Sequence, residues 1–168
     1  MKFLIVVDMQ VDFITGSLGS EQAKAIVPRV VDKVKGYDGI VIFTRDTHES
    51  DYLSTQEGKK LPVEHCIKGT VGWEICDELK AFAKNIVDKP TFGCLNLPSV
   101  LNGYGKVDEI ELCGLCTDIC VISNAIILKS AFPEAKVIVD GKCSAGVSLE
   151  SHNNALNAMR AVQIEIID

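Results

Sequence analysis

A candidate nucleophile, Cys120, lies where a strand-like segment gives way to a helical one. The strand-like segment is Glu109–Leu112, and the helical segment is the strongly apolar run Ile119–Leu128. Gly114 permits a sharp turn between them, and Thr117 is well suited to cap the helix. With Thr117 as the cap, Cys120 would lie in the first helical turn, where free N–H groups and the helix dipole favour a thiolate. Because the thiolate is the reactive form of cysteine, this position predicts a nucleophile.

Other functions for the same cysteines have to be weighed. Cys113 and Cys116 form a C-x-x-C pair, which could be a redox dithiol or half of a zinc site, although no second C-x-x-C exists to complete one. Adding Cys120 gives a spacing that matches no common iron–sulfur motif. Buried cysteines are also ordinary packing residues. On local evidence alone a nucleophile, a redox pair and a packing role all stay open.

Length and composition limit the classes of protein. We expect residues 1–168 to form one domain with its own core, since 47% of the residues are apolar and 24% charged. A net charge of −6 disfavours nucleic acid and anionic membranes as partners, and no apolar run is as long as a membrane span. The cysteine count is odd, at seven, and no export signal is visible. Reduced thiols and a cytoplasmic location are therefore expected.

The elements that would position Cys120 alternate along the chain. Short apolar runs predict six strands, at Met1–Val7, Gly39–Thr44, Asn85–Val87, Glu109–Leu112, Lys136–Val139 and Val162–Ile167. Helical spacing predicts helices at Val27–Val34, Trp73–Ala83, Leu97–Leu101, Ile119–Leu128 and Ser148–Ala161. Residues 49–70 are polar and predict a long loop, which in a compact domain is usually either functional or disordered. The alternation predicts an α/β fold: a three-layer α/β/α sandwich around a doubly wound, six-stranded, mainly parallel sheet.

Residues able to do chemistry follow successive strands of this predicted sheet. Asp8 follows the first strand, Asp46 and His48 the second, Lys89 the third and Cys120 the fourth. Ligands of doubly wound sheets bind outside the carboxyl ends of the strands, so these side chains should converge at one edge. Each has an ordinary alternative, such as a helix cap for Asp8 or a solvated charge for Lys89. Their convergence predicts a cysteine hydrolase.

Six motifs extend this interpretation over nearly the whole chain. They are D-M-Q-V-D-F at Asp8–Phe13, R-D-T-H at Arg45–His48, H-C-I-K-G-T at His65–Thr70, D-K-P-T-F-G at Asp88–Gly93, G-L-C-T-D-I-C at Gly114–Cys120 and D-G-K-C-S-A-G at Asp140–Gly146. With these motifs the sequence resembles the isochorismatase-like cysteine hydrolases, which include nicotinamidases, N-carbamoylsarcosine amidases and ureidoacrylate amidases. The resemblance is greatest to the nicotinamidases, and it implies the isochorismatase-like fold.

The resemblance implies a catalytic triad of Asp8, Lys89 and Cys120. Asp8 would take the thiol proton and later protonate the leaving nitrogen, and Lys89 would stabilise the two anions. The family places the oxyanion between two backbone N–H groups, which match Cys116 and Cys120 here. It also has a cis peptide bond at the position of Leu115–Cys116. The family usually has a small apolar residue where Cys116 stands, so its sulfur is expected to have no catalytic role.

A metal site is predicted beside the triad by four residues in a short window: Asp46, His48, Glu57 and His65. Mixed oxygen and nitrogen ligands suit a divalent ion such as zinc, iron or manganese. In nicotinamidases this pattern holds a metal that meets the pyridine nitrogen of the substrate. The alternative is two surface histidines in a polar loop. His152, the third histidine, is expected to be a surface or packing residue.

The substrate implied by the resemblance is nicotinamide, hydrolysed to nicotinate and ammonia in pyridine nucleotide salvage. Phe13 would cover one face of the ring, whereas Leu61 stands where nicotinamidases often have a tryptophan. Family members commonly form homo-oligomers. One alternative is a metal-independent amidase for a carbamoyl or ureido compound. Another is a thiol redox protein that uses Cys113 and Cys116, which predicts indifference to the loss of Lys89.

Overall fold

The protein, described over residues 1–168 by a computed structural model, is built on one six-stranded sheet in which every strand pair is parallel. The strands are β1 (Lys2–Val7), β2 (Ile40–Asp46), β3 (Ile86–Lys89), β4 (Glu109–Leu115), β5 (Lys136–Ala145) and β6 (Glu165–Ile167). Their order is β3-β2-β1-β4-β5-β6, which confirms the doubly wound sheet. The strand order reverses between β1 and β4, so the ligand crevice is expected outside the carboxyl ends of these two strands.

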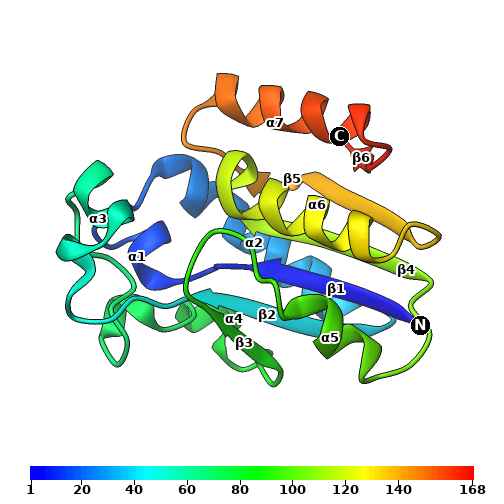
Figure 1. Ribbon diagram of the computed structural model, residues 1–168, viewed down its shortest axis with the longest axis horizontal. Coiled ribbons are helices and arrows are strands. Elements are labelled where there is room, and N and C mark those ends of the chain that lie inside the picture. The colour runs from blue at the N-terminus through cyan, green and yellow to red at the C-terminus, as the bar shows by residue number, and fades with distance from the viewer.

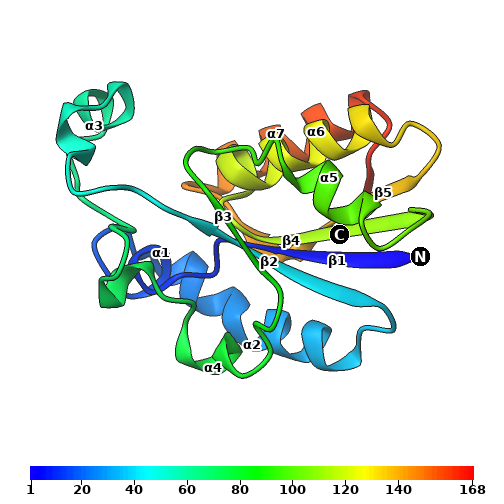
Figure 2. The ribbon, with the colours of Figure 1, turned by 60° about the horizontal axis from the view of Figure 1, so that its bottom comes forward.

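Helices cover both faces of the sheet. They are α1 (Val11–Ile14), α2 (Glu21–Gly36), α3 (Gln56–Lys60), α4 (Asp77–Lys80), α5 (Leu97–Asn102), α6 (Ile122–Ala131) and α7 (Leu149–Ala161). Figure 2 shows α5, α6 and α7 over one face and α2 and α4 under the other. Alternate residues of β1 point to opposite faces of the sheet. Phe3 and Ile5 pack in the core layer beside α5, α6 and α7, and Leu4 and Val6 pack in the layer beside α2 and α4. No helix has the length and apolar character needed to cross a bilayer.

Two of the predicted elements differ strongly from the structure. The helix predicted over Trp73–Ala83 is reduced to α4, because Ile75 bridges to Gln10 and the Cys76 amide donates to the Met9 carbonyl at 3.0 Å. These contacts hold the chain extended before α4. The predicted loop 49–70 contains α3, which lies away from the helical layers at the strand carboxyl ends (Figure 1).

Gly114 lies inside β4 rather than after it, since the strand runs on to Leu115. Its φ is +120°, and a Cβ at this position would lie 2.2 Å from the carbonyl oxygen of Val7. Only glycine fits here, and it lets β4 approach β1 closely. The consequence is that the turn after β4 begins beside the end of β1, where Asp8 lies.

Lys33 on α2 forms an ionic cluster with two carboxylates of the sheet. Its Nζ pairs with Glu111 on β4 and lies 2.7 Å from Oδ2 of Asp140 on β5. Burial would raise the pKa of Asp140, but Lys33 and the Cys143 amide, which donates to its Oδ1 at 3.0 Å, hold that pKa below its ordinary value. A carboxyl with a lowered pKa stabilises the fold above its unfolded pKa of about 3.9. This stabilisation is lost as the pH falls through the lower, folded value.

Replacing Lys33 by methionine should lower the free energy of unfolding at pH 7 by about 3 kcal/mol, because two largely buried carboxylates lose their cation. The deficit relative to wild type should shrink between pH 7 and pH 3, since the stabilisation that Lys33 gives the Asp140 carboxylate is lost as the pH falls through its lowered pKa. Urea titrations at the two pH values measure both effects. Lys24→Met is the control on the same helix, because its pair with Glu21 is exposed and should matter little. Equal losses in the two variants would contradict a stabilising role for the cluster.

Candidate active site

The turn that carries Cys120 is stabilised by a residue of another helix and has no side-chain cap of its own. The peptide bond Leu115–Cys116 is cis, as predicted, and residues Thr117–Val121 form a π-helical turn before α6. Thr117 is not the cap, so that expectation was wrong: its Oγ1 is hydrogen-bonded to Nδ1 of His152 at 2.7 Å. Thr117 is fully buried. His152 on α7 therefore binds the nucleophile turn directly, beyond the surface or packing role expected for it.

Lys89 brings the predicted triad together. Its Nζ lies 2.7 Å from Oδ2 of Asp8 and 3.5 Å from Sγ of Cys120. The same ammonium group donates to the Thr91 carbonyl at 3.0 Å and lies 3.2 Å from Oδ1 of Asp46. Asp8 and Lys89 are fully buried, and Cys120 is nearly so. A charged lysine in such a place is stable because it is surrounded by anions and acceptors.

The thiol of Cys120 is not the thiolate expected from its place at a helix start. Burial raises its pKa well above the ordinary value, and the charge of Asp8 raises it further, while Lys89 opposes this only in part. Desolvation outweighs the helix terminus here because the side chain is almost wholly enclosed. Burial also raises the pKa of Asp8, against the charge of Lys89. The resting cysteine is therefore a thiol that needs a base, and Asp8 is a carboxylate made more basic than usual.

The four predicted metal ligands gather next to the triad. The ligand atoms of Asp46, His48, Glu57 and His65 all lie within 4.8 Å of one another. Asp46 ends β2, and its Oδ2 is 2.9 Å from Nε2 of His48 and 3.8 Å from Nε2 of His65. Asp46 also contacts Lys89, so it joins this cluster to the triad.

The orientation of the two histidines fits a metal ion. His48 Nε2 is buried and faces the carboxylates of Asp46 and Glu57, at 2.9 and 3.6 Å, which is how a ligand atom faces a shared cation site. His65 uses Nδ1 to bond the Val63 carbonyl at 2.8 Å and leaves Nε2 facing the carboxylates. Such a second bond fixes the ring of a metal-binding histidine. Tyr52 packs on both rings, with centroid distances of 4.6 and 4.9 Å. The residues present therefore fit a divalent cation with mixed nitrogen and oxygen ligands.

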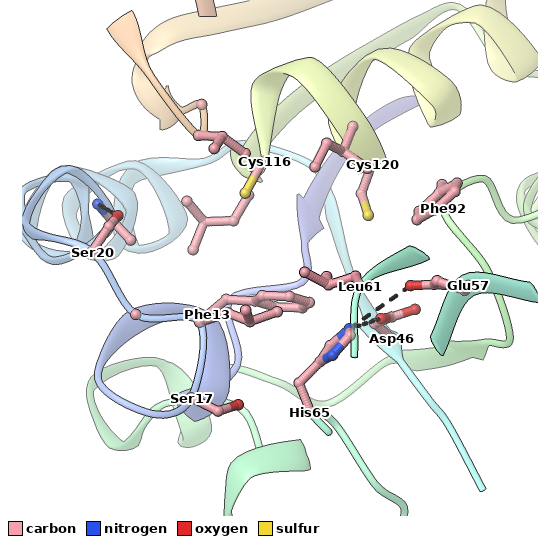
Figure 3. A pocket seen from close by; sticks show the side chains of 17 residues that line it. Phe13, Ser17, Ser20, Asp46, Glu57, Leu61, His65, Phe92, Cys116 and Cys120 are labelled. Atoms are coloured by element: carbon pink, nitrogen blue, oxygen red, sulfur yellow. Dashed lines mark hydrogen bonds and ion pairs between the residues drawn. The ribbon is translucent and has the colours of Figure 1, made fainter. Parts of the chain in front are cut away.

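A cavity of about 430 Å³ opens onto both groups. Cys120 and Cys116 line it on one side, and Asp46, Glu57 and His65 on another. Figure 3 shows the thiol of Cys120 and the carboxylates facing the same space. The predicted walls Phe13 and Leu61 also line this cavity, and Phe13 packs on His65 with ring centroids 5.5 Å apart. Asp8, Lys89 and His48 are not among the lining residues.

Several residues that support the site were missed by the sequence interpretation. Gln10 donates to the Asp46 carbonyl at 2.8 Å and accepts from its amide at 2.7 Å, and Thr44 donates to Asp8 at 2.7 Å. Gln10 lies within a motif, but its partner is distant in the chain. Asn124, whose Nδ2 donates to the Cys120 carbonyl at 2.8 Å, and Phe92, which lines the cavity, were also missed. No sequence signal marks Asn124, whereas Phe92 belongs to the motif that contains Lys89.

The two cysteines of the C-x-x-C pair, Cys113 and Cys116, lie in different environments. All seven cysteines are free thiols. Cys113 is fully buried in β4, whereas Cys116 lines the cavity. Burial raises the pKa of Cys116 to about 12 and raises that of Cys113 as well, so neither has the low pKa of a reactive redox thiol.

Comparison with known proteins identifies the family and the fold of the chain. Residues 2–168 match the model of the isochorismatase domain. A nicotinamidase of Acinetobacter baylyi is 30% identical over an alignment that covers 84% of this chain and 80% of that protein. The structure of a nicotinamidase/pyrazinamidase from Bacillus subtilis superposes with a TM-score of 0.87 at 25% identity, covering 99% of both chains. A pyrazinamidase of Pyrococcus horikoshii, solved in complex with zinc, has a TM-score of 0.84 at 25% identity, covering 99% of this chain and 98% of that one. The chain therefore belongs to the isochorismatase domain family.

Proposed function

We propose that this protein is a nicotinamidase, an amidohydrolase that cleaves the amide C–N bond of nicotinamide to give nicotinate and ammonia. The observation that carries the proposal is the cavity with the Cys120 thiol on one side and the Asp46–Glu57–His65 ligand face on the other. One end of a small ring can be bound while its amide is presented to the thiol. The similarity to nicotinamidases over the whole chain supports this substrate.

In the proposed reaction Asp8 takes the proton of Cys120, and the sulfur attacks the amide carbon to form a C–S bond. Lys89 stays a cation between the two anions. The oxyanion would accept hydrogen bonds from the backbone N–H groups of Cys116 and Cys120. In support, the N–H of Cys116 donates to no acceptor within the protein.

The intermediate would then break its C–N bond. Asp8 returns the proton to the leaving nitrogen, ammonia departs, and a thioester remains on Cys120. Water attacks the thioester with Asp8 again as the base, which releases nicotinate and restores the thiol. The raised pKa of Asp8 suits these repeated transfers, since it makes the carboxylate a stronger base than an ordinary aspartate.

The metal would be a zinc, iron or manganese ion held by Asp46, His48, Glu57 and His65. When bound, such an ion supplies a Lewis-acid site that can hold the pyridine nitrogen and so orient the ring. The chain's own contribution is the rigid placement of these ligands by Gln10 and Tyr52. The remaining expectations, a homo-oligomer in the cytoplasm with a role in nucleotide salvage, stay predictions of the sequence.

Ammonia release from purified enzyme tests the function. We expect turnover of nicotinamide and a loss of about 10²-fold in kcat/KM after chelation, because the ring is no longer positioned. A ureido or carbamoyl amide should be a poor substrate before and after chelation. If nicotinamide is not hydrolysed, and a non-aromatic amide is hydrolysed equally well with and without chelator, the result would favour the metal-independent amidase. Readdition of each metal separately identifies the ion that restores activity.

A further inference from the structure

Two neighbouring side chains of the nucleophile turn, Thr117–Val121, are hydrogen-bonded to α7 and to the segment that leads into it. The Thr117 hydroxyl is bonded to Nδ1 of His152 at 2.7 Å, which is the only hydrogen bond that this side chain makes. Oδ1 of Asp118 accepts a hydrogen bond from the Val147 amide at 3.1 Å. Because the turn has no side-chain cap of its own, these two bonds hold its first residues against α7.

The histidine side of this contact is well fixed. α7 begins with a capping box, in which the side chains of Ser148 and Ser151 each accept a hydrogen bond from the other's backbone N–H. Gly146 packs directly on the histidine, since a Cβ there would lie 2.9 Å from Cβ of His152. One turn further along α7, Leu156 is buried in the core. The imidazole ring therefore reaches the turn from a helix that is fixed at its start and along its buried side.

Thr117 lies at a sensitive position in the proposed reaction. It stands between Cys116 and Cys120 in the chain, whose backbone N–H groups would bind the oxyanion, and Cys120 also supplies the sulfur. Figure 3 shows the side chains of both cysteines facing the cavity from this part of the chain. Neither Thr117 nor His152 lines that cavity. A change at His152 would therefore displace the reacting groups without removing any contact with a bound ligand.

We propose that His152 is a positioning residue, which acts through Thr117 to hold the oxyanion N–H groups and the Cys120 sulfur in their reactive orientation. The inference rests on the proposed function, since it concerns the rate of the step at Cys120. Hydrogen-bond donors stabilise an oxyanion only where they are aimed at it, and a displacement of about 1 Å can cost about 10²-fold in rate. The expected signature is a lower kcat with an unchanged KM.

The test compares His152→Leu with wild type by ammonia release from nicotinamide. We expect kcat to fall about 10- to 30-fold and KM to stay within about twofold. Thr117→Val should give the same loss, and the double variant should lose no more than either single variant, because all three lack the same hydrogen bond. Asn153→Leu is the control and should keep the wild-type kcat, because Asn153 is the next residue of α7 and is exposed.

His152→Asn tests whether the hydrogen bond itself is needed. Burial lowers the pKa of His152 below its ordinary value, so the ring is neutral at pH 7 and an uncharged amide is a suitable replacement. The asparagine amide can place a donor or an acceptor where Nδ1 lies. We therefore expect kcat in this variant to stay within about threefold of wild type.

An aldehyde analogue of the substrate separates this role from a merely structural one. Nicotinaldehyde should add to the enzyme: the Cys120 sulfur bonds to the aldehyde carbon, the π electrons of the C=O bond move onto oxygen, and the thiol proton passes to Asp8. The adduct places an oxyanion against the proposed N–H groups, whereas pyridine has the same ring and no carbonyl. In His152→Leu the inhibition constant of the aldehyde should rise by about the factor by which kcat falls, and that of pyridine by less than about twofold.

An unchanged kcat in folded His152→Leu would overturn the proposal, as would a raised KM at normal kcat, or an equal loss of kcat in Asn153→Leu or His152→Asn. Equal weakening of both inhibitors would do the same. Urea denaturation shows whether each variant is folded, and Thr117→Val replaces His152→Leu if the latter is not. If wild type hydrolyses another amide but not nicotinamide, the proposed function fails alone, and the same comparison is made with that amide. If it hydrolyses no amide, both fail.

Discussion

Replacing Cys120 by alanine is expected to lower kcat for nicotinamide by more than about 10³-fold, because no other group can form the acyl intermediate. The matched change Cys113→Ala should leave most of the activity, since that thiol is fully buried in β4. Cys116→Ala should also remain active, because the proposed role of this residue belongs to its backbone N–H. Ammonia release measures all three variants, and mass spectrometry after acid quench should detect the acyl group on Cys120 of the wild type.

The same set of variants separates the hydrolase from a redox protein. Comparable losses of activity in Cys120→Ala and Cys113→Ala would favour a redox dithiol formed by the C-x-x-C pair. A loss confined to Cys116→Ala and Cys120→Ala would assign a chemical role to the Cys116 sulfur, which lines the cavity. Retained turnover in Cys120→Ala would contradict the nucleophile altogether.

Replacing Lys89 by methionine is expected to reduce both activity and stability, although the two side chains are similar in length. The variant leaves the carboxylates of Asp8 and Asp46 buried without their shared cation. We expect the free energy of unfolding to fall by about 3–5 kcal/mol, the usual result of removing one member of a buried ion pair. We also expect kcat to fall by about 10²–10³-fold, because the anions at Cys120 and Asp8 lose their electrostatic support.

Urea denaturation and initial rates, corrected for the folded fraction, measure the two losses separately. Lys84→Met is the matched control, because Lys84 precedes the same strand and is exposed. It should change neither quantity. Normal turnover in folded Lys89→Met would contradict the triad and agree with a redox function. Loss of stability with normal turnover would make Lys89 a structural residue alone.

The amino-acid sequence was sufficient to predict the sheet and the edge at which the site lies. Continuous apolar runs such as Met1–Val7 predict strands because both faces of a central parallel strand are buried. The polar residue after each run then lies at a carboxyl end, so Asp8, Asp46 and Lys89 could be placed near Cys120 without any structure. Where contacts between distant residues compete with helical periodicity, the prediction was wrong: the helix expected over Trp73–Ala83 is shortened by the bridge from Ile75 to Gln10.

Only the tertiary structure decided how each group in the site is held and charged. Sequence spacing made Thr117 a helix cap, but its hydroxyl is bonded to His152, 35 residues away. A helix start favours a thiolate at Cys120, yet burial beside Asp8 raises its pKa instead. The ring of Phe92 faces the cavity because Asn124 fixes its backbone from another element. Periodicity along a chain reports which face of an element is buried, whereas desolvation and hydrogen bonds between distant residues depend on the complete packing.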